Sequence, residues 1–195
     1  MPRRGFIALP PTRTDVAVAK ACARVANPPL ERTLGVLTWL ADEKVVLAGI
    51  GAFWIYARLA QSDRTVSRGA DQMLCATVLA GMLPHLFKYL VDRKRPDRTV
   101  VHGSRRGIPR SGDAWDSFPS GHALHLGAIA GTAARLVPPP GRHLVWPMAT
   151  VLAGTRIMLL AHYLSDVVAG LAFGALLDKA VGGLLGIARP AHRDR

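Results

Sequence analysis

The sequence is poor in cysteine and in acidic residues. Its two cysteines, Cys22 and Cys75, show no zinc-binding spacing, and Cys75 lies inside an apolar run. A disulfide scaffold and a zinc site are therefore not expected. Only 13 residues are acidic against 25 Lys and Arg, which gives a formal net charge of +12. So basic a chain predicts an anionic partner, which could be nucleic acid, a membrane surface or a phosphorylated substrate.

Charged residues make up only 19% of the chain, whereas hydrophobic residues make up 50%. The mean hydropathy of +0.21 is low for a membrane protein, but the charges are concentrated in a few segments. The length of 195 residues suits one domain. The apolar part of the N-terminus is short and broken by proline, so we interpret Arg3 and Arg4 as part of a basic tail rather than of a signal peptide.

A short helix is predicted at 15–27, capped by Thr14 or Asp15 and ended by Pro28 and Pro29. Its two basic residues make it a poor membrane span. We expect it to lie on the membrane surface, with a soluble tail helix as the alternative. The sequence thus divides into an N-terminal tail and surface helix (1–32), a membrane-embedded domain (33–188) and a basic C-terminal tail (189–195).

Five apolar stretches within 33–188 predict an all-α, multi-pass transmembrane bundle. They cover roughly 33–60, 69–91, 119–137, 143–164 and 167–188. Asp42, Glu43 and Lys44 interrupt the first, and the part from Val45 to its end is only about 24 Å long as a helix. Glycine recurs in these stretches, which favours close helix packing in lipid over a soluble bundle.

The loops between the stretches indicate where functional residues gather. The segment 93–118 is long, basic and rich in glycine and proline, whereas 138–141 is a tight connection. If the second, third and fourth stretches cross the membrane fully, the end of the second, the start of the third and the end of the fourth share one side. The three polar blocks described next lie at these places.

The first block is KYLVDRKRP, residues 88–96. Lys88 and Arg95 are seven residues apart, which on a helix places them on one face about two turns apart. Pro96 ends the helix. Alone, this block is better explained as the basic end of a transmembrane helix.

The second block is Pro119-Ser120-Gly121-His122, which opens an apolar helix. Proline suits the first helical turn, and Asp116 or Ser117 could cap it. Free N–H groups at a helix start bind phosphate, Gly121 lets an anion approach the backbone, and Ser120 adds a hydroxyl. Alone, this block could be a plain helix cap.

The third block contains Thr155, Arg156, His162 and Asp166. Asp166 is four residues after His162, so on a helix its carboxylate could accept the imidazole proton and set the tautomer. Arg156 is six residues before His162, about 120° around an ideal helix. A long side chain or a distorted helix must bring Arg156 into the site. Alone, this block could be a His-Asp pair at a membrane boundary.

Together, the three blocks present three cations, two histidines, one carboxylate and one helix N-terminus on one side of a membrane. Their order and spacing, from Lys88 to Asp166, resemble the full signature of the type 2 phosphatidic acid phosphatase superfamily. That family includes lipid phosphate phosphatases, bacterial class A acid phosphatases and vanadium haloperoxidases. The chain departs from it at Thr155, where Ser is frequent, and in having five rather than six predicted spans.

The resemblance implies a metal-independent phosphatase with no cofactor. Its partners would be a lipid phosphate or diphosphate and the bilayer, not nucleic acid. The resemblance implies that His162 attacks phosphorus, Asp166 orients it, and His122 protonates the leaving oxygen and then activates water. The implied phosphate-binding residues are Lys88, Arg95, Ser120, Gly121 and Arg156.

Four further features are expected to lie outside catalysis. His85 is assigned to helix packing or a boundary, and His125 to packing with a role behind His122 as the alternative. Asp178 and Lys179 could pair with each other or with a neighbouring span. Three loop arginines, at 105, 106 and 110, are expected to be solvated or to contact lipid headgroups.

Three other functions compete with a lipid phosphatase: a phosphatase for soluble esters, a vanadium-dependent haloperoxidase, and a non-enzymatic basic protein that binds anionic lipid or nucleic acid. The apolar stretches disfavour the first, the short chain disfavours the second, and the third does not explain the spacing of His162 and Asp166. The lipid remains open among polyprenyl diphosphate, phosphatidate and phosphatidylglycerol phosphate. Both sides of the membrane are basic, and only analogy with bacterial relatives favours a site on the outer face.

Overall fold

The computed structural model describes residues 5–60, 63–100 and 113–186, whose regular secondary structure is α-helical apart from two short strands and a 3-10 turn. The elements in chain order are β1 (Ile7–Ala8), α1 (Arg13–Val25), α2 (Pro28–Trp39), α3 (Glu43–Leu59), α4 (Arg64–Leu90), β2 (Val91–Asp92), η1 (Pro96–Arg98), α5 (Gly121–Leu136), α6 (Arg142–Met158) and α7 (Leu164–Leu184). The strands pair in parallel, with Ile7 opposite Val91. The predicted all-α class is confirmed.

Polar side chains define where several helices begin. Thr12 caps α1 and forms a capping box with Asp15, so the predicted cap at Thr14 is wrong. Asp42 and Asp63 cap α3 and α4 by accepting hydrogen bonds from N–H groups two residues ahead, at 3.0 and 2.7 Å. The helix predicted at 15–27 therefore starts and ends two residues earlier.

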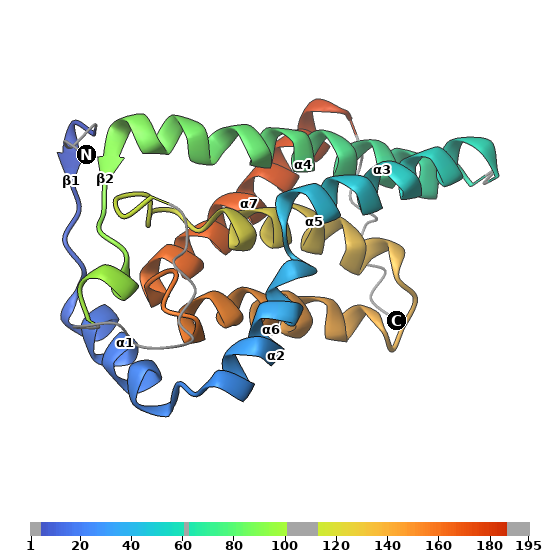
Figure 1. The fold of residues 1–195 in the computed structure, drawn as a ribbon. Coiled ribbons are helices and arrows are strands. Elements are labelled where there is room, and N and C mark those ends of the chain that lie inside the picture. The colour runs from blue at the N-terminus through green and yellow to red at the C-terminus, as the bar shows by residue number, and fades with distance from the viewer. Residues whose placement is uncertain (1–4, 61–62, 101–112, 187–195) are drawn as a thin grey trace, which may run out of the picture.

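Helix α5 lies at the centre of the bundle, between α4 and α6, and α7 crosses it closely (Figure 1). Glycine makes this approach possible. A Cβ atom on Gly174 would lie 2.1 Å from the carbonyl oxygen of Leu124, and one on Gly127 would lie 2.3 Å from that of Leu171. The prediction that small residues let the helices pack closely is confirmed for this pair.

The apolar stretches do not all form long helices. Within the described ranges, α4 and α7 are long and apolar enough to cross a membrane. Helices α3, α5 and α6 have 17, 16 and 17 residues. The first predicted stretch is split between α2 and α3 at the turn before Asp42, and the fourth ends at Met158 rather than at 164.

Helix α1 packs against the rest of the protein. Its small residues Ala19, Cys22 and Ala23 are buried against Leu160 and Tyr163, in the connection between α6 and α7. That α1 lies on the membrane surface stays a prediction, and the structure shows in addition that α1 packs against the protein. One face of α1 covers the loop that carries the third sequence block.

A polar cluster links α4, α5 and α7 away from the three blocks. The Asp178 carboxylate is buried and accepts hydrogen bonds from Gln72, at 2.8 Å, and from Thr132. Arg135 lies 3.6 Å from the same carboxylate. Asp178 was predicted to pair either with Lys179 or with a neighbouring helix. It pairs with side chains of neighbouring helices, while Lys179 is exposed. The loop arginines at 105, 106 and 110 and the tail 189–195 lie outside the described residues.

Candidate active site

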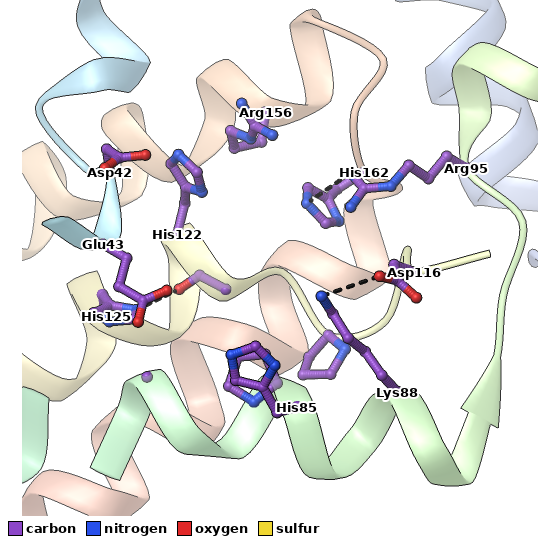
Figure 2. Close-up of a pocket in the computed structure, with 14 residues that line it drawn as sticks. Asp42, Glu43, His85, Lys88, Arg95, Asp116, His122, His125, Arg156 and His162 are labelled. Carbon is purple, nitrogen blue, oxygen red and sulfur yellow. Dashed lines mark hydrogen bonds and ion pairs between the residues drawn. The ribbon is translucent and has the colours of Figure 1, made fainter. Parts of the chain in front are cut away.

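The three sequence blocks converge on one cavity of about 290 Å³ (Figure 2). The residues from these blocks that line it are Lys88, Arg95, Pro119, Gly121, His122, Arg156 and His162. Ser120 and Asp166 are fully buried and lie outside the lining. The predicted convergence of the two histidines and three cations on a single hollow is confirmed.

Lys88 reaches the cavity from helix α4, whereas Arg95 reaches it from an extended segment. Helix α4 ends at Leu90, so the prediction that one helix carries both residues is wrong. The chain continues extended, pairing Arg93 with Asp116, and Arg95 is held by the carbonyl oxygens of Asp113 and Ala161 at 2.9 and 3.0 Å. Lys88 forms an ion pair with Asp116 at 3.0 Å.

Ser120 is the N-cap residue of α5, and the helix begins at Gly121. The proposed caps Asp116 and Ser117 are therefore wrong, and Pro119 precedes the helix rather than forming its first turn. The Ser120 hydroxyl is buried and has no hydrogen-bond partner within the described part of the chain. A Cβ atom on Gly121 would come no closer than 3.6 Å to Pro84. This helix start thus retains a free hydroxyl beside the cavity.

A sharp turn brings Arg156 and His162 together. Helix α6 ends at Met158, and Leu160 has a φ of 54°, in the left-handed region. The turn folds the N–H groups of Ala161 and His162 back onto the Arg156 carbonyl, at 3.0 and 3.2 Å. His162 thus lies in the connection between α6 and α7 rather than in a helix. The distortion that was expected to bring Arg156 into the site is the end of helix α6. Arg156 also contacts Thr38 of α2, at 3.4 Å.

The hydrogen bonding of His162 determines which ring nitrogen carries the proton. Nδ1 lies 2.7 Å from the carbonyl oxygen of Ser117. A carbonyl oxygen only accepts, so Nδ1 carries the proton and Nε2 keeps its lone pair. Arg95 lies 3.4 Å from Nε2. Burial, and then the charges of Arg95 and Arg156, hold the pKa of His162 well below its ordinary value, so the ring is neutral.

Asp166 acts on His162 through an intermediary. Its Oδ2 atom is 4.0 Å from His162 Nδ1, too far for the predicted direct hydrogen bond. The same oxygen accepts hydrogen bonds from the Ser117 hydroxyl at 2.6 Å and from the Tyr163 N–H at 2.8 Å. The carboxylate therefore holds Ser117, whose carbonyl holds the histidine.

Sequence reasoning missed two residues of this arrangement. Arg93 donates hydrogen bonds to Asp166 and, at 2.7 Å, to Asp15 of α1. Ser117 was considered only as a cap. Arg93 and Arg95 are both buried, whereas Lys94 between them is exposed, and no pattern in the sequence distinguishes Arg93 from its basic neighbours.

The rest of the cavity wall is formed by residues to which no catalytic role was assigned. They are Asp42, Glu43, Gly81, Pro84, His85, Asp116 and His125. His85 and His125 both line the cavity, so assignment to helix packing alone is insufficient for either. Within residues 5–60, 63–100 and 113–186, no group of three or more His, Cys, Asp or Glu could hold a metal ion.

The PAP2 superfamily matches residues 71–182, more than half of the chain, and the protein belongs to this family. Lipid A 1-phosphatase of Rhizobium johnstonii is 45% identical over 101 residues, which are 50% of this chain and 40% of that protein. Lipid A 1-phosphatase of Rhizobium etli is 42% identical over 105 residues, 52% of this chain and 44% of that protein. The chain thus matches under half the length of these curated relatives.

Two solved structures share the fold. A transmembrane PAP2 type phosphatidylglycerolphosphate phosphatase from Bacillus subtilis has a TM-score of 0.64 at 22% identity, over 90% of this chain and 86% of that one. LpxE from Aquifex aeolicus has a TM-score of 0.63 at 17% identity, over 85% and 93% of the two chains. The two helices of this fold that are long and apolar enough to cross a membrane are α4 and α7, within the described residues.

Proposed function

We propose that this protein hydrolyses a lipid phosphate monoester through a phosphohistidine formed on His162, without a metal ion. The observation that supports this most is the environment of His162. Its Nδ1 proton is held by the Ser117 carbonyl, and its bare Nε2 lies beside the Arg95 guanidinium in a cavity shared with His122. A neutral, oriented imidazole next to a phosphate-binding cation is what a phosphoryl-accepting nucleophile requires.

The reaction takes two steps. Nε2 of His162 attacks phosphorus as the bond to the leaving oxygen breaks, and His122 donates a proton to that oxygen. Water then attacks the phosphohistidine, gives a proton to His122 and releases inorganic phosphate. Lys88, Arg95, Arg156 and the Gly121 N–H, which belong to the cavity lining, bind the phosphoryl oxygens. The Ser120 hydroxyl, which is buried outside that lining and unpartnered in the described part of the chain, is a further donor. Asp166 keeps His162 in place through Ser117.

The relatives support a lipid as substrate. The Rhizobium proteins are named for lipid A and the Bacillus subtilis protein for phosphatidylglycerolphosphate, and both names denote phosphatases. A soluble ester or a halide has no such support. We therefore include the predicted lipid classes, among them polyprenyl diphosphate and phosphatidate, in the range of substrates to be tested.

The proposal is tested by phosphate release from a panel of lipid phosphates in detergent micelles. His162→Ala should abolish release while leaving the protein folded. His143→Ala, at an exposed position of α6, is the matched control and should retain activity. Vanadate should inhibit, and EDTA should not. Normal turnover by His162→Ala, or inhibition by EDTA that added metal reverses, would overturn the proposal.

We further propose that the chain crosses the bilayer several times and that the cavity opens at the outer face. Asp113 is exposed and adjoins the residues that carry the site. An Asp113→Cys variant in a Cys75→Ser, Cys22→Ser background should react with an impermeant maleimide in intact cells. Labelling only after the cells are broken would place the site inside.

A further inference from the structure

The cavity has a side that the proposed reaction does not use. Figure 2 shows Asp42, Glu43 and His125 on one side, with Arg95 and His162 on the other and His122 between the two groups. The proposed phosphoryl site lies on the side of Arg95 and His162. Since His122 serves the leaving oxygen, the remainder of the leaving group extends toward Asp42, Glu43 and His125, which we call the acceptor wall.

His125 shows that this wall is built to accept hydrogen bonds. Its side chain is buried, with 2% of its surface exposed, although it belongs to the cavity lining. Nδ1 lies 2.9 Å from the Gly121 carbonyl, so Nδ1 is the donor and Nε2 bears the lone pair. Nε2 is buried and has no hydrogen-bond partner among the described residues. A buried acceptor without a partner is costly, which points to a ligand group that donates to it.

Glu43 faces the same space as His125. If Gly81 carried a Cβ atom, that atom would lie 2.9 Å from Glu43 Oε1 and 3.7 Å from His125 Nε2. The Glu43 carboxylate therefore packs against Gly81 of α4, and His125 Nε2 lies close to the same position, so the two acceptors are near each other.

Asp42 extends the wall along the start of α3. One carboxylate oxygen accepts a hydrogen bond from the Lys44 N–H at 3.0 Å, which leaves the other oxygen for a ligand. Neither Asp42 nor Glu43 takes part in an ion pair with a Lys, Arg or His side chain of the described ranges. The wall therefore retains negative charge next to a cationic phosphoryl site.

We propose that the acceptor wall selects the leaving group: it binds hydroxyl or amide N–H groups of a sugar that carries the scissile phosphate, and it disfavours a second phosphate. This inference rests on the proposed phosphatase activity. Carboxylates and a bare imidazole nitrogen accept hydrogen bonds from sugar hydroxyls, whereas the leaving phosphate of a diphosphate brings negative charge against two carboxylates. A site built to bind a hydroxyl discriminates strongly against a substrate without one.

The test compares kcat/KM on three micellar substrates: an acylated glucosamine 1-phosphate, phosphatidate and farnesyl diphosphate. Their leaving groups are an acylated sugar with further hydroxyl and amide N–H groups, a diacylglycerol whose only hydroxyl is the one released, and farnesyl phosphate. His125→Phe should lower the ratio of sugar phosphate to phosphatidate about tenfold or more, because an acceptor is lost. Glu43→Gln should raise the ratio of diphosphate to phosphatidate about tenfold, because a negative charge is removed.

Asp63→Asn is the matched control for Glu43→Gln, because it also neutralises an acid at the start of a helix but lies at the far end of α4. It should leave all three ratios unchanged. If Glu43→Gln and His125→Phe alter turnover of the three substrates by one common factor, the selection proposal is overturned while the phosphatase activity stands. If the wild-type protein releases phosphate from none of them, the proposed function fails, and the selection proposal fails with it.

Discussion

The guanidinium of Arg93 lies between the carboxylates of Asp15 and Asp166, forming ion pairs with both. All three side chains are buried. Asp15 also accepts hydrogen bonds from Ser165 N–H, at 2.9 Å, and Thr12 N–H, at 3.0 Å. Burial alone would raise the pKa of Asp15, but these hydrogen bonds lower it to about 2. Through Arg93, the N-terminal helix is thus tied to the carboxylate that holds the loop with His162.

Removing the Arg93 side chain should strongly destabilise the protein. Arg93→Ala leaves Asp15 and Asp166 as buried carboxylates without their cation, and breaking a buried ion pair in this way costs about 3–5 kcal/mol. Thermal unfolding in detergent should show a large drop in midpoint. Lys94→Ala, the exposed neighbour, is the control and should shift the midpoint little. Equal shifts for the two variants would contradict a structural role for the Asp15–Arg93–Asp166 bridge.

The close approach of α5 and α7 predicts opposite effects for one substitution at two positions of α7. Gly174→Ala would place a methyl group 2.1 Å from the Leu124 carbonyl oxygen and should destabilise by about 1–3 kcal/mol or more. Gly183→Ala has nothing within 4 Å and should stabilise by up to about 1 kcal/mol through helix propensity. The free energy of unfolding of both variants checks this, and a neutral Gly174→Ala would contradict the packing.

Stability should fall as the pH decreases below about 6.5, in part because of His162. The ring is buried and neutral in the folded protein, where its pKa is well below the unfolded value of about 6.5. Below that value the unfolded chain binds a proton that the folded protein does not, so acid favours unfolding by up to about 1.4 kcal/mol per pH unit.

The effect is measured as the slope of unfolding free energy against pH between 6.5 and 5. His162→Asn should reduce this slope, because the group that titrates on unfolding is gone. His143→Asn is the control for the substitution itself, at an exposed position of α6. An unchanged slope in His162→Asn would mean that the ring is already protonated in the folded protein.

The residues that line the site could be identified in the sequence because each of the three blocks is a short motif of neighbouring residues. Lys88, Arg95, His122, Arg156 and His162 were all expected at one place, and all line one cavity. The periodic apolar stretches likewise predict helices, since burial of one helix face depends on residues three and four apart. The class of fold and half of the cavity lining therefore follow from the order of residues alone.

Other features depended on contacts between residues far apart in the chain. The Ser117 carbonyl that sets the His162 tautomer, the Asp15–Arg93–Asp166 bridge and the acceptor wall each join segments separated by dozens of residues. No local pattern encodes such a pairing, because it exists only once the helices have packed against one another. The sequence by itself thus determined the family and the charged and histidine residues that meet at the cavity. Only the tertiary structure decided which neighbour orients each of them, because that depends on the distances between packed helices.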